Sequence, residues 1–320
     1  MDTVFVGGGT PTLLAPGELG RILEGIDRVW GLAPDAEVTT EANPESVDPG
    51  SLSALRAAGF TRISLGMQST APHVLAVLDR RHTAGRAARA AAEAREAGFG
   101  HVNLDLIYGT PGETAADFAG SLDAVLAAGV DHVSAYALIV EEGTRLAGRM
   151  RRGELPYPDD DVAADRYLAA DYTLSGAGLD WYEVSNWAAG PGARCRYNVG
   201  YWTGGDWWGL GPGAHSHVGG VRWWNVKHPA TYAARLTGGV SPGAGREVLT
   251  GVQRREEDVM LRLRLAEGLP LSTLDDAGRE AARRALDDGL LEPEGYASGR
   301  AVLTLRGRLL ADAVVRDLLP

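Results

Sequence analysis

The sequence predicts an α/β fold in which a parallel sheet is covered by helices. Strand-like and helix-like segments alternate from the first residues onward, and five successive strand–helix units can be traced. The strand-like segments are short apolar runs, and several of the helical segments end at a glycine. Alternation of this kind is typical of a parallel sheet with helices packed outside it.

The segments follow one another in a regular order. Strands are expected at residues 3–6, 37–41, 62–66, 101–108 and 132–139. Apolar residues at helical spacing predict helices at residues 17–30, 49–58, 71–78, 83–97, 114–128 and 160–176. Asp48-Pro49 is a helix-start signal, and Gly59, Gly98 and Gly129 are stop signals.

Polar side chains gather where these strands end. Glu41, Gln68 and Asp105 lie at or near the ends of three different strands, and Arg80 follows in the next segment. An open or closed barrel brings such ends to one mouth, where barrels build their active sites. Two carboxylates, an amide and a guanidinium suit a zwitterionic, ribose-bearing ligand. The alternative is that each residue caps a helix or forms a structural ion pair.

A glycine triplet, Gly7-Gly8-Gly9, follows the first strand and is continued by Thr10-Pro11. Glycines there let backbone amides approach a ligand closely. The triplet is not a dinucleotide fingerprint, because Thr12 occupies the position of the third glycine. A tight strand-to-helix turn is the alternative.

The composition of the chain argues against several classes of protein. The chain has 320 residues, a net charge of −11 and no basic stripe, so we expect no nucleic-acid partner. No apolar run approaches the ~20 residues of a membrane span, and no signal peptide opens the chain. With one cysteine, Cys195, a disulfide-stapled secreted protein is excluded and a cytoplasmic location is expected. A single thiolate cannot by itself ligate an iron–sulfur cluster.

The composition changes after residue 180. Residues 181–240 hold seven of the eight tryptophans, and residues 238–245 form a Gly/Pro-rich linker. Residues 246–320 predict helices, a short hairpin at 290–305 and a last helix, in an order that resembles a small winged-helix domain. The predicted divisions are therefore 1–180, 181–240 and 246–320.

The aromatic segment contains candidate iron ligands. Aromatic side chains interspersed with Gly and His can line a flat apolar pocket, and the polar atoms of Tyr, Trp and His can face into it. Cys195, Tyr197, His215 and His217 are all side chains that can ligate iron. A loop-rich aromatic core is the alternative interpretation.

Several of these motifs together resemble those of one family. They are Val6-Gly7-Gly8-Gly9-Thr10-Pro11, Glu41-Ala42-Asn43-Pro44-Glu45, Arg62 to Ser69, Asn103 to Gly109 and Asn198-Val199-Gly200-Tyr201-Trp202. In this combination the sequence resembles the HemW family, which are radical S-adenosylmethionine (SAM) proteins related to oxygen-independent coproporphyrinogen III oxidase. The resemblance runs from residue 2 to about residue 319.

The resemblance implies a fold, a function and site residues. The fold would be a partial TIM barrel of the radical SAM type at residues 1–180, a heme-linked segment at 181–240 and a HemN-like domain at 246–320. SAM contacts would be Gly8, Gly9, Thr10, Glu41, Gln68, Arg80 and Asp105. The function would be that of a heme chaperone, which depends on SAM and a [4Fe–4S] cluster and delivers heme to acceptor proteins.

Two departures from the family pattern qualify this expectation. The family's cluster-binding Cys-x3-Cys-x2-Cys motif has no counterpart, so we expect a chain truncated before those cysteines and missing the first βα unit. The family's His-Asn-x-x-Tyr-Trp motif has Tyr197 in place of the histidine. Tyr197 is therefore the first candidate for a heme ligand, with His215 and His217 next.

Two other functions are compatible with the motifs. One is an oxygen-independent coproporphyrinogen III oxidase of porphyrin biosynthesis, although we do not expect oxidase activity from these residues alone. The other is a heme-binding module that uses neither SAM nor a cluster. Asn198, Tyr201 and Trp202 favour the chaperone over the oxidase.

Overall fold

The computed structural model describes residues 1–319. Contacts within the chain divide it into two compact units, one of residues 1–197 and one that begins at Asn198. The first unit contains the predicted parallel sheet, and the second contains the aromatic segment and the C-terminal helices.

The first unit is built on one seven-stranded sheet with the order β1-β2-β3-β4-β5-β7-β6. Its strands are β1 Thr3–Val6, β2 Glu37–Ala42, β3 Arg62–Gln68, β4 His101–Tyr108, β5 His132–Ala137, β6 Asp180–Glu183 and β7 Asn186–Ala188. Its helices are α1 Pro16–Trp30, α2 Pro49–Ala57, α3 Pro72–Val77, α4 Arg86–Glu96, α5 Ala115–Ala128, α6 Arg145–Arg151 and α7 Asp160–Gly176.

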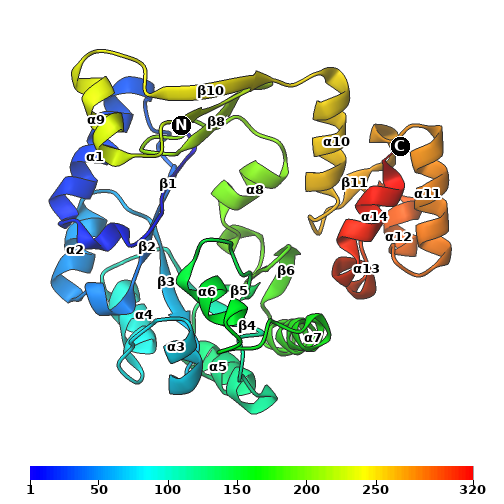
Figure 1. The fold of residues 1–320 in the computed structure, drawn as a ribbon, viewed down its shortest axis with the longest axis horizontal. Helices are drawn as coiled ribbons and strands as arrows, with labels where there is room; N and C mark the ends of the chain where they lie inside the picture. Colours follow the sequence, from blue (N-terminus) through cyan, green and yellow to red (C-terminus); the bar gives the residue numbers. More distant parts are fainter. Residues whose placement is uncertain (320) are drawn as a thin grey trace. The chain divides into compact units, whose positions relative to one another are not determined.

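The five strands β1 to β5 pair in parallel and in chain order, and β7 and β6 add antiparallel strands at one edge. Figure 1 shows that the sheet is curled and that α2, α4 and α5 lie on its outer side. Sequential order with helices outside is the pattern of a barrel, whereas a doubly wound sheet changes direction within its strand order. The predicted α/β partial-barrel fold class is confirmed.

Side chains alternate along these strands between an apolar outer face and a polar inner face. On β3, Ile63 and Leu65 are fully buried, and they alternate with Arg62, Ser64 and Gly66. The same alternation continues on β4 and β5, as the two-residue period of a strand requires. The interior of the barrel is therefore polar, and its polar groups must pair with one another.

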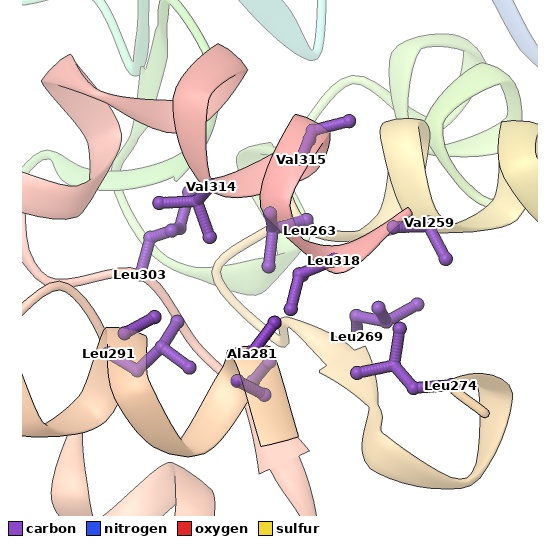
Figure 2. Close-up of a cluster of buried hydrophobic side chains, with 13 residues drawn as sticks. Val259, Leu263, Leu269, Leu274, Ala281, Leu291, Leu303, Val314, Val315 and Leu318 are labelled. Carbon is purple, nitrogen blue, oxygen red and sulfur yellow. The ribbon is translucent and has the colours of Figure 1, made fainter. Parts of the chain in front are cut away.

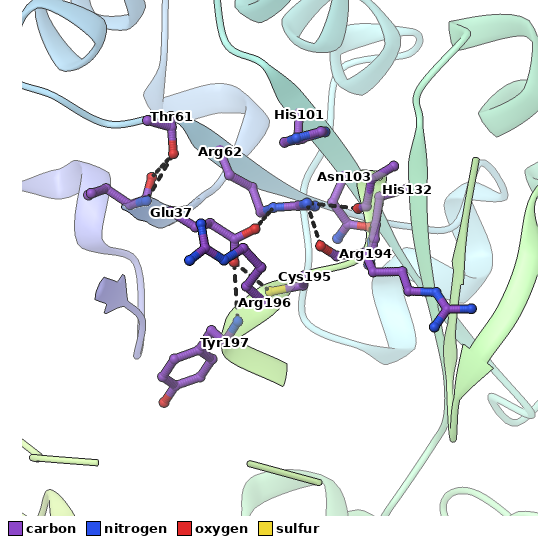
Figure 3. A network of polar contacts seen from close by, with 12 residues as sticks. Glu37, Thr61, Arg62, His101, Asn103, His132, Arg194, Cys195, Arg196 and Tyr197 are labelled. Atoms are coloured by element: carbon purple, nitrogen blue, oxygen red, sulfur yellow. Dashed lines mark hydrogen bonds and ion pairs between the residues drawn. The ribbon is translucent and has the colours of Figure 1, made fainter. Parts of the chain in front are cut away.

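A buried ion pair lies at the amino ends of β2 and β3. Nε of Arg62 is 3.0 Å from Oε2 of Glu37, and both side chains are almost fully buried. Nη2 of Arg62 also donates to the carbonyls of Ala193 and Arg194, at 2.7 and 3.1 Å. Glu37 accepts from the backbone amide of Tyr197 at 3.2 Å (Figure 3). The pair thus attaches residues 193–197 to the barrel.

A chain of hydrogen bonds continues from this region across the sheet. The backbone amide of Cys195 donates to the hydroxyl of Tyr182, and that hydroxyl lies 2.8 Å from Nε2 of His132. Nδ1 of His132 is 2.7 Å from Oδ1 of Asn103, whose amide nitrogen donates to Asp105 at 2.7 Å. Burial lowers the pKa of His132 to about 3, so its ring is neutral at pH 7.

The second unit begins with a three-stranded antiparallel sheet of order β10-β9-β8. Its elements are α8 Arg196–Trp202, which starts at the end of the first unit, β8 His215–Val218, β9 Val221–Asn225, α9 Pro229–Thr237 and β10 Gly243–Val248. Arg222 of β9 bonds to Glu257, which ties this sheet to the helix that follows.

The C-terminal part of the second unit is helical. Its elements are α10 Gly251–Arg262, β11 Leu269–Pro270, α11 Asp276–Asp287, α12 Pro293–Ala297, β12 Arg300–Ala301, α13 Leu305–Leu309 and α14 Ala311–Leu318. Buried apolar side chains of these helices and of the segments between them, including Leu263, Leu291 and Val314, form one core (Figure 2).

The expected hairpin at 290–305 is present as a short antiparallel bridge between Leu291 and Leu303. The amide of Glu292 donates to the carbonyl of Val302 beside it, and the amide of Thr304 donates to that of Leu290. Pro293 begins α12 instead of continuing a strand, because proline has no N–H for a β ladder and is favoured at the first helical turn. No helix among residues 1–319 is long and apolar enough to cross a membrane.

The buried pair supplies the first prediction. Replacing Arg62 by Met leaves the Glu37 carboxylate buried without its cation, which typically costs about 3–5 kcal/mol. We expect urea denaturation of Arg62→Met to show a loss of this size. Arg21→Met removes the exposed pair with Glu18 and should cost less than about 1 kcal/mol. Equal losses in the two variants would contradict a structural role for Arg62.

Candidate functional site

A cavity opens at the carboxyl ends of β1 to β4. Its lining residues lie on β2 to β4 or in the segments that follow β1 to β3: Gly8, Gly9, Thr10, Pro11, Glu41, Ala42, Asn43, Ser64, Gly66, Gln68, Arg80 and Asp105. All seven residues named from the sequence as SAM contacts are among them. The structure brings these residues together at one mouth, and their role as SAM contacts stays a prediction.

The glycine loop and Glu41 form one wall of the cavity. The backbone amide of Gly8 donates to Oε2 of Glu41 at 3.0 Å. Gly8 has φ +127°, a region that side-chain-bearing residues rarely adopt, so the loop needs glycine there. Burial raises the pKa of Glu41 above its usual value, and the bond from Gly8 opposes that rise. The loop is therefore held by a carboxylate that also faces the cavity.

Gln68 is held in an unusual conformation at the end of β3. It has φ +66°, which is uncommon for a residue other than glycine. Its Oε1 is buried and has no hydrogen-bond partner among the described residues. At Gly66 an added Cβ would lie only 2.8 Å from Nε2 of Gln68. A strained residue with an unsatisfied polar atom in a cavity points to a ligand that supplies the missing partner.

Asp105 lies deeper in the same cavity, in contact with the polar interior of the barrel. Ser64 donates to both of its carboxylate oxygens, at 3.1 and 3.0 Å, and Asn103 donates to one of them. Removal from water raises the pKa of Asp105 to about 6, and the nearby Glu41 carboxylate adds to the rise. The hydrogen bonds from Ser64 and Asn103 oppose it. Asp105 is therefore a strong hydrogen-bond acceptor that changes protonation near neutral pH.

Sequence reasoning placed Ser64, Gly66 and Asn43 within motifs but did not name them as SAM contacts, although all three line the cavity. A signal for two of them was present, because Ser64 and Gly66 share the inward face of β3 with Arg62 by the two-residue period. Asn43 follows Glu41 in the same strand-end cluster.

The structure separates the heme-ligand candidates. Tyr197 belongs to the first unit, where its ring stacks on Phe5 with centroids 4.6 Å apart. His215 and His217 lie on β8 of the second unit. Cys195 is buried in the first unit, with its thiol 3.5 Å from Oε1 of Glu37.

Comparisons with known proteins agree with this geometry. Residues 1–125 match the sequence model of the radical SAM superfamily. The chain is 61% identical over 319 residues to the heme chaperone HemW of Mycobacterium tuberculosis (strain ATCC 25618 / H37Rv), a match that covers 100% of this chain and 81% of that protein. It is 34% identical to the heme chaperone HemW of Synechocystis, covering 89% of this chain and 70% of that relative.

The chain belongs to the HemW family. Its fold is also that of coproporphyrinogen III oxidase (HemN) from Escherichia coli, with a TM-score of 0.83 over 99% of this chain and 77% of that chain. Sequence identity to HemN is 22%, so this likeness bears on the fold alone.

Membership of the radical SAM superfamily implies SAM and a [4Fe–4S] cluster as cofactors of the family. The donors around the cavity fit SAM, because Glu41, Gln68 and Arg80 can bond to charged and hydroxyl groups. The residues present do not fit a cluster. Cys195 is the one cysteine of the sequence, and within residues 1–319 no three His, Cys, Asp or Glu side chains are placed to hold a metal ion.

The raised pKa of Asp105 gives a prediction for Asp105→Asn. Because the folded protein binds this proton more tightly than the unfolded chain, the wild type loses stability as the pH rises from about 4 to about 6. Asparagine carries no such proton. The stability of Asp105→Asn relative to the wild type should therefore rise by up to about 3 kcal/mol across this window and stay level above it. Denaturation curves at several pH values measure the difference, and a flat difference would contradict the assignment.

Proposed function

We propose that this chain is a heme chaperone of the HemW type, which binds heme and passes it to acceptor proteins. The observation that carries the proposal is the 61% identity to a heme chaperone over the full length of this chain. Identity at this level over the whole of this chain supports a shared fold and a shared function.

The cavity of the barrel would bind SAM. In this proposal Arg80 takes the carboxylate of the methionine part, since a guanidinium matches carboxylate geometry. Glu41 and Asp105 accept hydrogen bonds from ammonium or ribose hydroxyl groups, and Gln68 gains a partner for its unsatisfied Oε1. Gly8 and Gly9 would line the part of the cavity that takes a polar end of the ligand, and the amide of Gly8 is already bonded to Glu41.

Heme would bind within residues 181–240. This segment holds the Asn198-x-x-Tyr201-Trp202 motif on α8, together with the candidate ligands Tyr197, His215 and His217. Flat aromatic side chains suit the faces of a porphyrin, and each candidate can ligate iron.

The SAM assignment predicts different effects for two neighbouring arginines. Arg80→Ala removes a charge from the cavity wall and should weaken SAM binding about tenfold, which is about 1.4 kcal/mol. Arg81→Ala removes the same charge from an exposed position that does not line the cavity. It should change affinity less than about twofold. Isothermal titration calorimetry measures the SAM affinity of both variants. Equal losses of affinity would show that SAM binding depends only on the net charge of this region.

The heme assignment predicts binding followed by transfer. Ferric heme titrated into the full chain should give a Soret band that saturates at one heme per chain. Apomyoglobin added to the loaded chain should then acquire the spectrum of metmyoglobin as heme leaves. The thermally unfolded chain is the control for adsorption of heme to exposed aromatics. A wild-type chain that binds heme no better than this control is not a heme chaperone.

A further inference from the structure

Three aromatic rings in the second unit form a series that begins at the Asn198-x-x-Tyr201-Trp202 motif. The ring of Tyr201 lies against Trp207, with centroids 4.5 Å apart. Trp207 in turn lies against the imidazole of His217, at 5.0 Å. The series connects the motif on α8 to β8 through side chains alone.

The backbone holds Trp207 opposite His217. The amide of Trp207 donates to the carbonyl of His217 at 2.8 Å, and the amide of His217 donates to the carbonyl of Trp207 at 2.9 Å. His217 is also paired on its other side with Arg222 of β9. The imidazole is therefore placed by two neighbouring strand-like segments, and its position relative to Trp207 is fixed.

The two nitrogens of His217 have different surroundings. Nδ1 lies 3.5 Å from the carbonyl of Gly205 and 3.6 Å from Oδ1 of Asp206, which are both acceptors. Nε2 is buried and has no hydrogen-bond partner among the described residues. A buried polar atom without a partner typically costs about 1–3 kcal/mol. An imidazole with acceptors at one nitrogen and nothing at the other has the arrangement of a metal-ligating histidine.

The other candidates lack this arrangement. His215 is exposed, and its ring stacks on Trp224 at 5.9 Å. Tyr197 lies in the first unit, where Phe5 covers one face of its ring and Glu37 holds its backbone amide.

We propose that Nε2 of His217 is the axial ligand through which this chain holds the iron of heme, an inference that rests on the proposed function. Nε2 donates its lone pair to iron and displaces a weakly held water, while Nδ1 keeps its proton, directed at Gly205 and Asp206. Neutral imidazole ligates both ferric and ferrous iron, so reduction leaves the heme in place. Because Nε2 is buried, a neighbouring side chain must move before ligation, and binding includes a first-order step.

The test uses ferric heme and the full chain. The variants are His217→Gln and, as the matched control on the same strand, His215→Gln, with Tyr197→Phe as the third. Circular dichroism establishes that each variant is folded. We expect His217→Gln to weaken heme binding at least about tenfold and to shift the Soret band. The other two variants should keep the wild-type spectrum and affinity.

A second measurement needs no variant. Resonance Raman spectra of the wild type after reduction should show an iron–histidine stretching band, which a phenolate ligand does not give. Loss of heme on reduction overturns the inference even where His217→Gln does not fold. Absence of that band does so where the absorption spectrum shows that the reduced heme is five-coordinate. An unchanged spectrum in folded His217→Gln, or a changed spectrum in Tyr197→Phe alone, also overturns it and leaves the proposed function standing. A wild type that binds no heme overturns both.

Discussion

The buried pair of Glu37 and Arg62 is the contact on which the first unit most depends. Neither charge has water around it, so each needs the other and also needs further hydrogen bonds to complete its shell. Those further bonds come from the backbone of residues 193–197, which follow more than a hundred residues later in the chain. The pair therefore fixes two strands to each other and fixes to them the segment that leads into the Asn198 motif.

The polar residues at the two ends of β2 and β3 have different surroundings. At the amino end of β2, Glu37 is fully bonded within the protein, whereas Glu41 at the other end bonds to one backbone amide and faces the cavity. On β3 the corresponding residues are Arg62 and Gln68. Arg62 donates through Nε and Nη2, and its Nη1 has no partner among the described residues. Oε1 of Gln68 also has no partner among them. The bonded groups at the amino ends stabilise the fold, whereas Gln68 at a carboxyl end lines a cavity where a ligand can supply the partner of its Oε1. This division agrees with the general placement of sites in barrels.

Local signals made the elements of the first unit predictable from sequence. Thr114 and Gly129 bound α5 because a threonine side chain caps the first turn and glycine accepts the left-handed conformation after the last. Cavity residues such as Glu41, Gln68 and Asp105 were predictable because they are polar residues on the C-terminal parts of predicted strands. The network at the opposite end was not, since Arg62 bonds to Ala193 across 131 positions and no local pattern encodes that contact. The expected hairpin at 290–305 is present but short, because Pro293 begins α12 directly after the bridge between Leu291 and Leu303.

The identity of the axial ligand determines which of the two units binds the heme iron. Sequence pattern favoured Tyr197 because it occupies the histidine position of the motif, yet its amide and ring are held by Glu37 and Phe5 of the barrel. His217 belongs to the unit that begins at Asn198 and is joined to the motif by Tyr201 and Trp207. With His217 as the ligand, the cavity proposed for SAM and the heme iron belong to different units, which α8 joins covalently. If SAM binding is to affect heme release, a change in the first unit must then alter the second. With Tyr197 as the ligand, SAM and the heme iron would both bind to the first unit.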